Sequence, residues 1–257
     1  MTCEFCNRRL VYVTRPYIST NFDHHLCHAA SAFFLSPFDR ALIITLNEDG
    51  DGDSGMIAIG QGKEIHVLRK ISFPNSLVWV YSQVTDLIGF LPRQEEHKTQ
   101  WLSLEGEPEF KAVFLDMLRK PRSHVPRLDY SFVQRGFAKR FTFSAKFYRK
   151  TGLPTDQRQL SEDQRRALAS SIQAACAEVV SELAERLRRQ HGTTQVCLAE
   201  GLFQNALLVS SIEKNLGTNQ LFVPPAPGNA GTAVGAAHLG WHQVFDKPRK
   251  EPVSGKT

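Results

Sequence analysis

Residues 41–71, ALIITLNEDGDGDSGMIAIGQGKEIHVLRKI, contain three apolar runs separated by glycine-rich segments. The first run, ALIITL, is short and rich in β-branched residues, which predicts a buried strand. The runs MIAIG and EIHVLRKI flank Gln61-Gly62-Lys63, which predicts a β-hairpin. Between the first two runs lies NEDGDGDSG, which we interpret as a carboxylate-rich loop. The stretch therefore predicts the order strand, acidic loop, strand, turn, strand.

Helical patterns lie on both sides of this stretch. Upstream, in FDHHLCHAASAFFLSPF, Asp23 is placed to cap an alanine-rich run that Pro37 ends, which predicts a helix over 24–35. Downstream, apolar residues at helical spacing predict an amphipathic helix over 76–90. A second helix is expected over 107–118.

The strongest helical signal begins at Ser161. Gln164 completes a capping box with it, and Gly192 supplies the C-terminal stop. This helix leads into strand-like QVCLA, a glycine turn at Gly201 and helical FQNALLVSSIEKN. Strand-like LFV follows, and then the loop PPAPGNAGTAVGAA opens a last helix. Strands and helices alternate, which predicts an α/β fold.

The composition is typical of a globular protein. The 257 residues are 42% hydrophobic, with a net charge of +5 and a mean hydropathy of −0.28. No apolar run approaches the ~18–20 residues of a membrane span, and the N-terminus lacks the apolar core of a secretory signal. Five cysteines, an odd number, favour a reducing compartment. We therefore expect a cytoplasmic protein, without a zinc site at Cys3-x-x-Cys6, which has no second pair.

The positive charge is concentrated in one segment. Lys111 to Lys150 contains eleven Lys or Arg and two acids, a local net charge of +9, which leaves −4 for the rest of the chain. Aromatic residues alternate with these cations, a pattern that can bind RNA or single-stranded DNA. The same pattern also fits an amphipathic surface packed on a neighbouring domain. We therefore do not expect nucleic acid to be a partner of this chain, nor a membrane.

His24-x-x-x-His28 is the sharpest local motif. Four-residue spacing on a helix places both imidazoles on one face, where they can chelate a divalent ion. His25 points about 100° away from that face and is not expected to be a ligand. The alternative is a histidine-rich helix start that serves capping or solubility.

Glycine-rich turns supply the other candidates. In 47–53 the alternating carboxylates could bind calcium, but Gly60 stands where a calcium loop needs its last carboxylate. The same loop could approach phosphate oxygens through glycine amides, or could be a solvated hairpin loop. The junctions LAEGLFQN and PGNAGTAVGAA could present helix N-termini to a nucleotide. Tight packing turns are the alternative for both.

Five blocks in order resemble one family. They are HHLCHAASAF, TLNEDGDGDSG, IGFLPRQEEHKTQWLSLEGEP, CLAEGLFQNALLVSSIE and FVPPAPGNAGTAVGAA, and together they span residues 24–237. The blocks are similar to those of the carbamoyltransferases of nodulation and antibiotic tailoring. That family is related to the actin-like ATPase fold and to the tRNA threonylcarbamoyladenosine synthases.

The resemblance implies a fold and a domain arrangement. We expect an α/β protein with a mixed sheet of the ribonuclease-H-like, actin-like ATPase type, forming one half of the full duplicated fold. It consists of an N-terminal extension (1–22), a catalytic domain (23–243) with a helical insertion at about 76–160, and a disordered tail (244–257).

The resemblance also implies a reaction and a site. Carbamoyl from carbamoyl phosphate passes through a carbamoyl-adenylate, made with ATP, to a hydroxyl of a small-molecule acceptor. A divalent metal, usually iron, is held by the catalytic pair His24 and His28 and by Asn229. The residues expected at the phosphates and the adenosine are Asp51, Gly52, Gly201, Asn205 and Gly231.

Some features depart from the family pattern. Glu200 stands where the family has a glycine that lets the backbone approach the nucleotide, and Asn47 replaces an aspartate. Relatives carry an additional N-terminal segment and a C-terminal domain, so we expect a truncated or split enzyme completed by a partner chain. The alternatives are a catalytically inactive binding or regulatory subunit, and a tRNA-modifying relative with the basic segment as its RNA face.

Overall fold

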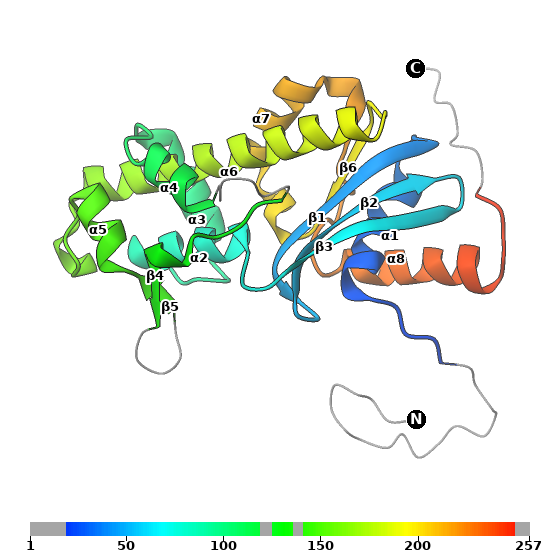
Figure 1. Ribbon diagram of the computed structural model, residues 1–257, viewed down its shortest axis with the longest axis horizontal. Coiled ribbons are helices and arrows are strands. Elements are labelled where there is room, and N and C mark those ends of the chain that lie inside the picture. Colours follow the sequence, from blue (N-terminus) through cyan, green and yellow to red (C-terminus); the bar gives the residue numbers. More distant parts are fainter. Residues whose placement is uncertain (1–18, 119–124, 136–140, 250–257) are drawn as a thin grey trace, which may run out of the picture.

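One mixed sheet organises the protein (Figure 1). The computed structural model describes residues 19–118, 125–135 and 141–249. The strands run in the spatial order β3-β2-β1-β6-β7; β1, β2 and β3 pair antiparallel, and β6 and β7 continue the sheet in parallel. Their bounds are β1 Arg40–Gly50, β2 Asp53–Gln61, β3 Glu64–Ser72, β6 Val196–Ala199 and β7 Leu221–Phe222. The predicted α/β class with a mixed sheet is confirmed.

The predicted acidic loop is mostly strand. β1 and β2 extend toward each other until Gly50 pairs with Asp53, so that Asp51 and Gly52 alone form the turn. Both turn residues have positive φ, 56° and 84°, as a two-residue turn that matches the twist of an antiparallel pair requires. The predicted loop was too long, whereas the alternative of a hairpin at this stretch is confirmed. The second predicted hairpin, at Gly62, is confirmed.

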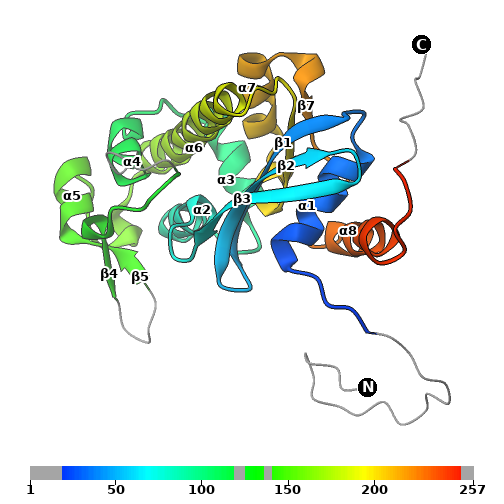
Figure 2. The same ribbon diagram turned by 45° about the vertical axis from the view of Figure 1, so that its right-hand side comes forward.

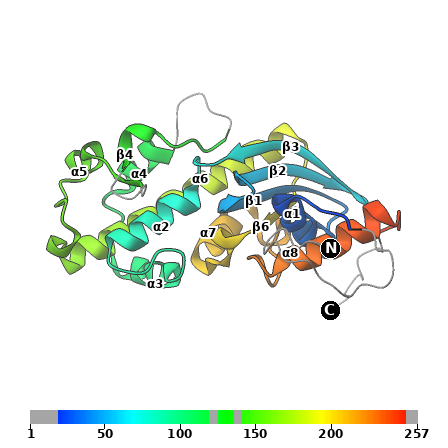
Figure 3. The same ribbon diagram turned by 90° about the horizontal axis from the view of Figure 1, so that it is seen from below.

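Both faces of the sheet are buried, because side chains alternate along the central strand β1. Leu42 and Ile44 contribute to a core shared with α2 (Leu77–Leu87), α6 and α7, whereas Ala41 and Ile43 pack against α1. The helices around the sheet are α1 His24–Leu35, α6 Glu162–Gln190, α7 Ala206–Leu216 and α8 Gly231–Leu239. Seen from below, α1 and α8 lie side by side on one face (Figure 3).

Two helix starts confirm the sequence predictions. Asp23 caps α1 through a hydrogen bond that its carboxylate accepts from the Leu26 amide at 2.9 Å. Ser161 and Gln164 form the predicted reciprocal capping box at the start of α6. The first of these fixes where the histidine-bearing turn of α1 begins.

Close contact between α1 and α8 depends on a glycine. A Cβ atom at Gly235 would lie 1.7 Å from the carbonyl oxygen of Cys27. Arg249, after α8, donates hydrogen bonds to the carbonyls of Phe33, Ser36 and Phe38 at the C-terminal end of α1. Backbone carbonyls left unpaired at a helix end are thus satisfied by a cation, which also complements the helix dipole.

The insertion forms a second lobe beside the sheet, and α6 runs along both (Figures 1 and 2). Its elements are α2 Leu77–Leu87, α3 Glu96–Leu102, α4 Lys111–Leu118, β4 Val133–Arg135, β5 Phe141–Phe143 and α5 Ala145–Thr151. The helix expected over 107–118 begins only at Lys111. Pro108 precedes it, and the Phe110 amide is bound by the Ser171 hydroxyl at 2.8 Å instead of by a helical turn.

No helix among the described residues combines the length and apolar character that crossing a membrane requires. The Cys3-x-x-Cys6 pair and residues 250–257 lie outside the described ranges.

Candidate functional site

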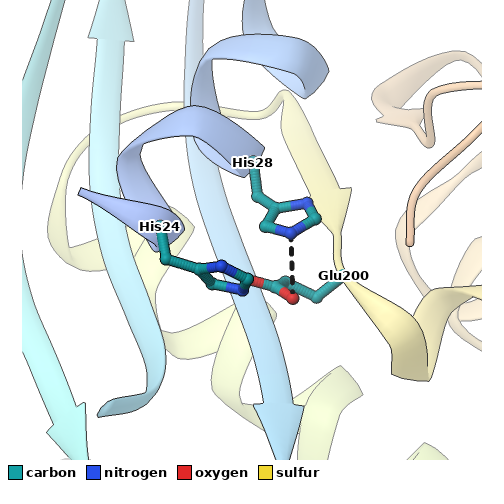
Figure 4. A group of neighbouring side chains, drawn as sticks. All are labelled: His24, His28 and Glu200. Carbon is teal, nitrogen blue, oxygen red and sulfur yellow. Dashed lines mark ion pairs between the residues drawn. The ribbon is translucent and has the colours of Figure 1, made fainter. Parts of the chain in front are cut away.

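The first turn of α1 presents three histidines toward the ends of β1 and β6. His24 is partly exposed, whereas His25 and His28 are fully buried. Figure 4 shows the rings of His24 and His28 directed at one carboxylate, that of Glu200 at the end of β6. The predicted chelating pair therefore meets a third side chain from another element.

Glu200 is an unusual residue in both backbone and burial. Its φ is +96°, a region that non-glycine residues rarely occupy, and its amide donates to the Pro227 carbonyl at 2.8 Å. The side chain is fully buried. Its Oε2 lies 3.3 Å from His28 Nε2, and its Oε1 lies 3.5 Å from His24 Nε2 and 3.0 Å from His25 Nδ1. A carboxylate is therefore surrounded by imidazole nitrogens.

These atoms approach one another without hydrogen-bond geometry. Among the described residues, both ring nitrogens of His28 and both carboxylate oxygens of Glu200 are buried and have no hydrogen-bond partner. The nearby Pro227 carbonyl raises the pKa of His28, but its position does not meet hydrogen-bond geometry. Leaving buried polar atoms unpaired costs on the order of 1–3 kcal/mol for each group.

A cation would satisfy these atoms. One nitrogen from each of His24 and His28 and one oxygen of Glu200 lie within 4.8 Å of one another. Two imidazoles and one carboxylate form a donor set that binds zinc and ferrous iron in proteins. The residues present therefore fit a divalent metal.

The protonation states agree with this donor set. Burial raises the pKa of Glu200, but the imidazoles of His24 and His25 outweigh it, so that the pKa falls below its ordinary value. Burial lowers the pKa of His28 to about 4, although the Glu200 carboxylate acts in the opposite direction. At neutral pH the carboxylate is charged and the His28 ring is neutral, as metal ligands must be.

The His25 ring lies beside Glu200 and is held by contacts to β1 and β2. Its Nε2 lies 3.0 Å from the Asp53 carbonyl, which can only accept, so Nε2 carries a proton. Its Nδ1 lies 2.9 Å from the hydroxyl of Thr45, which in turn accepts from the Met56 amide at 3.0 Å. The ring is thereby held in place beside Glu200.

Asn47 contacts the partly exposed His24 ring. Its amide nitrogen lies 3.3 Å from His24 Nε2, and its side-chain oxygen accepts from the Glu48 amide at 2.8 Å. The backbone amide of His24 donates to Asp51 Oδ2 at 3.1 Å. The end of β1 and the Asp-Gly turn thus contact the histidine turn directly.

The other predicted residues occupy three separate turns. Asp51 and Gly52 form the exposed turn between β1 and β2. Gly201 follows Glu200 directly, and Gly231 is the first residue of α8. Asn229 lies in the exposed loop before α8, where its carbonyl accepts from the amide and hydroxyl of Thr232. Its role as a metal ligand stays a prediction.

The side chain of Asn205 is already engaged within the protein. Its oxygen caps α7 by accepting from the Leu208 amide at 3.0 Å, and its amide donates to Gln173 at 2.8 Å and to the Tyr81 hydroxyl at 3.3 Å. The resulting network joins α7, α6 and α2. This geometry favours a structural role for the Asn205 side chain, which caps α7 and joins it to α6 and α2.

A cavity of about 230 Å³ lies between this turn and the insertion. It is bounded on one side by Gly201 to Asn205 and on the other by α2 and α3. Its lining residues are Val78, Tyr81, Arg93, Gln94, Glu96, His97, Gln100, Gly201, Leu202, Gln204 and Asn205.

Glu200 is the site residue that sequence reasoning missed. It was interpreted as a charge that obstructs a nucleotide turn. The available signal was its position, because an acid directly after a buried parallel strand lies at the edge where α/β proteins bind ligands. The structure places that acid against the histidine motif.

Three lysines of the basic segment form ion pairs. Lys146 and Lys150 form ion pairs with Asp129 and Asp116, at 3.0 and 2.6 Å. Lys111 pairs with Glu178 at 2.5 Å. These described lysines therefore do not form an unopposed cationic surface.

Comparison with known sequences assigns the chain to a family. The carbamoyltransferase N-terminus family matches residues 7–238, and the chain belongs to that family. The resemblance carried by the five sequence blocks is confirmed.

Particular relatives are much longer than this chain. It is 31% identical over 229 residues to the uncharacterized protein sll1178 of Synechocystis sp., and 30% identical over 223 residues to the nodulation protein NolO of Bradyrhizobium diazoefficiens. These matches cover 88% and 84% of this chain but 37% of each relative. The chain thus spans little more than a third of the length of these relatives.

Two solved structures show a distant likeness. HypF of T. kodakarensis matches with a TM-score of 0.47 and 15% identity, over 87% of this chain and 37% of HypF. Full-length HypF in a phosphate- and nucleotide-bound form matches with a TM-score of 0.48 and 14% identity, over 88% and 36%. No ligand or activity is carried over from a likeness at this level.

Proposed function

We propose that this chain is the catalytic N-terminal part of a carbamoyltransferase. It would transfer carbamoyl from carbamoyl phosphate, through a carbamoyl-adenylate made with ATP, to a hydroxyl group of a small-molecule acceptor. Family membership supports the reaction class. The observation that carries the proposal is the convergence of His24, His28 and Glu200 on one buried point.

In this proposal the three residues hold a divalent metal, which we propose to be iron. The bound cation would supply positive charge to the phosphate oxygens of the adenylate. The surrounding residues position these three side chains. Asn47 orients the His24 ring, and His25 contacts the Glu200 carboxylate. The buried face of α1 keeps water from His28 and Glu200.

The nucleotide would lie beside this point. We propose that the adenosine occupies the cavity between Gly201 and α3, and that the Asp51-Gly52 turn and the start of α8 at Gly231 face the phosphates. The positions of these turns around α1 support this arrangement. Arg93, which lines the cavity, is held by the Glu48 carboxylate at the end of β1.

The fold supports the more specific assignment. An antiparallel three-stranded meander continued by parallel strands, in the order β3-β2-β1-β6-β7, is the arrangement expected of one ribonuclease-H-like half of an actin-like ATPase. We propose that the catalytic domain spans residues 23–243, with the insertion at about 76–160. The parts of the longer relatives that have no counterpart here would come from a partner chain.

Metal titration tests the site. We expect the purified chain to bind one Fe²⁺ under anaerobic conditions, measured by calorimetry with Co²⁺ as an air-stable check. Glu200→Gln keeps the volume of the side chain but removes its charge, and should weaken binding at least about tenfold. His66→Asn is a matched control, because His66 is exposed on β3 and far from the cluster.

Two outcomes would contradict the assignment. If Asn229→Ala abolished binding while Glu200→Gln had no effect, the third ligand would be Asn229. If the unaltered chain bound no metal, the site itself would be rejected.

A second candidate is a catalytically inactive binding or regulatory subunit of the same fold. The surrounding imidazoles, at 3.0–3.5 Å, can offset the charge of Glu200 without a metal. In that case titration with Fe²⁺ and titration with ATP or AMP would both give no heat. Heat with both metal and nucleotide would instead favour the catalytic assignment.

A further inference from the structure

Gly50, the last residue of β1, lies directly against the His24 ring. A Cβ atom at position 50 would lie 2.3 Å from Cδ2 and 2.7 Å from Nε2 of that ring. Carbon atoms that are not bonded to each other are favourably placed at about 3.5–4.0 Å, so a side chain at position 50 and the ring cannot occupy their places together. The glycine therefore makes room for His24.

The backbone at Gly50 does not itself require glycine. Gly52, two residues later, has a positive φ, but Gly50 does not. Gly50 pairs with Asp53 as the last residue of a strand. Alanine could adopt this backbone without the strain that a positive φ imposes. The contact with the His24 ring is therefore the reason why a side chain does not fit at position 50.

Other groups crowd the His24 ring from within the protein. Its Nε2 lies 3.3 Å from the amide nitrogen of Asn47 and 3.5 Å from Glu200 Oε1. The ring centroids of His25 and His28 are 5.3 and 4.8 Å from that of His24. Because the His24 side chain is 23% exposed, a ring displaced by a methyl group at position 50 would turn toward solvent and away from Glu200.

We propose that Gly50 is a positioning residue, because the space beside its Cα admits the His24 ring and directs Nε2 toward the Glu200 carboxylate. The four-residue spacing of the histidines puts both on one helix face, but it does not decide how the His24 ring is turned. The inference rests on the proposed function, since the metal is what the positioned ring would bind. The orientation of the ring can also be observed without metal.

Gly60 of β2 offers a matched comparison, because it also lies against a ring of α1. A Cβ atom there would lie 2.5 Å from Cγ and Cδ2 of Phe33. Gly60 likewise has no positive φ. Phe33 is fully buried in the core between α1 and the sheet, so its ring has no solvent to turn into. The two glycines thus differ in what the displaced ring can do.

Two variants should therefore separate metal binding from stability. Gly50→Ala should weaken the binding of Co²⁺ at least about tenfold, because His24 no longer reaches the metal, and should leave the urea midpoint nearly unchanged. Gly60→Ala should lower the urea midpoint by about 1 M, because Phe33 cannot move aside. Its Co²⁺ affinity should stay within about twofold of that of the unaltered protein. A purely structural role for Gly50 would lower stability without changing the affinity of the folded protein.

The orientation of the His24 ring is measured on the metal-free protein. Long-range proton–nitrogen correlation spectra of the imidazoles would be recorded at neutral pH, with the His24 signals assigned from their loss in His24→Gln. We expect these signals to shift in Gly50→Ala and to keep their positions in Gly60→Ala. The signals of His66, which is exposed on β3, should stay in place in both variants.

The outcomes distinguish this inference from the proposed function. If the unaltered chain binds Co²⁺ and Gly50→Ala binds it equally well, Gly50 is not a positioning residue. Unshifted His24 signals in Gly50→Ala, or an equal shift in Gly60→Ala, overturn the inference whether or not the chain binds metal. If the unaltered chain binds no metal, the proposed function fails, and a His24 shift confined to Gly50→Ala still supports the positioning role.

Discussion

Ionisable side chains gather in two regions of this protein, and their surroundings differ. At the C-terminal end of β6, the His28 and Glu200 side chains are fully buried, and among the described residues the side-chain nitrogens of His28 and oxygens of Glu200 have no hydrogen-bond partner. In the insertion, charged groups pair at the surface, as Lys150 and Asp116 do with 43% and 57% of their side chains exposed. Surface pairs contribute about 0–1 kcal/mol, whereas an unmatched buried charge costs several.

This difference separates two kinds of polar groups. Unpaired polar atoms of the insertion are exposed, so water can hydrogen-bond to them and stability is not reduced. The unpaired side-chain atoms of His28 and Glu200 are buried away from water, so they reduce the stability of the fold. Such a penalty is typical of sites that bind a ligand. The comparison can be tested at three points.

The largest loss of stability is expected at the close contact between α1 and α8. In Gly235→Ala the new methyl group would overlap the Cys27 carbonyl, and α8 would have to move away from α1. We expect a loss of about 3 kcal/mol in the free energy of unfolding, measured by urea titration.

Gly240→Ala is the control, because a Cβ atom there meets nothing within 4 Å and the backbone is helical. Its stability should stay the same or rise by up to about 1 kcal/mol. Equal stability of Gly235→Ala and the unaltered protein would mean that α1 and α8 do not pack this closely.

An intermediate effect is expected at the network between the two lobes. Gln173→Ala removes the partner of both the Tyr81 hydroxyl and the Asn205 amide, which then remain buried and less satisfied. We expect a loss of about 2 kcal/mol.

A double-mutant cycle with Tyr81→Phe should show that the two changes are not additive. Gln83→Ala, on the same helix as Tyr81 but outside the network, should change stability by less than about 0.5 kcal/mol. Additive losses from Gln173→Ala and Tyr81→Phe would show that the three side chains do not act as a unit.

The smallest effect is expected from the surface charges of the insertion. Burial would raise the pKa of Asp129, but hydrogen bonds from Ser131 and Lys146 lower it to about 2. Because the folded-state pKa lies below its ordinary value of 3.8, this carboxylate stabilises the protein above pH 4, and the contribution is lost as the pH falls toward 2.

The Asp129 side chain is 36% exposed, so solvent screening keeps the contribution below about 1 kcal/mol. Urea titrations at pH 7 and pH 3 should show a smaller pH dependence in Asp129→Asn than in the unaltered protein. A difference of several kcal/mol would mean that the insertion contains a charge as buried as those at the sheet edge.

Local sequence signals predicted much of the architecture. The caps at Asp23 and Ser161 were identified because capping depends on residues within one turn. The hairpin at Gly62 followed from turn chemistry. The β4–β5 hairpin of the basic segment was not predicted, because three-residue strands carry too little periodicity to be recognised.

The site was predicted in part for the same reason. His24 and His28 share a helix face by spacing alone, so the motif could be read from five consecutive residues. The cavity at the Gly201 turn could not be predicted, because its walls come from segments that are far apart in the chain.

The sequence by itself determined the order of the strands and helices that build the central sheet, the chelating spacing of two histidines and the family to which the chain belongs. Only the tertiary structure placed the Glu200 carboxylate beside both imidazole rings. The parallel pairing of β1 with β6 sets Thr45 beside Ala199, and the next residue along β6 therefore lies against the histidine turn of α1. The spacing of residues within one helix turn can be read from the sequence, whereas a contact between different strands and helices depends on how the strands pair.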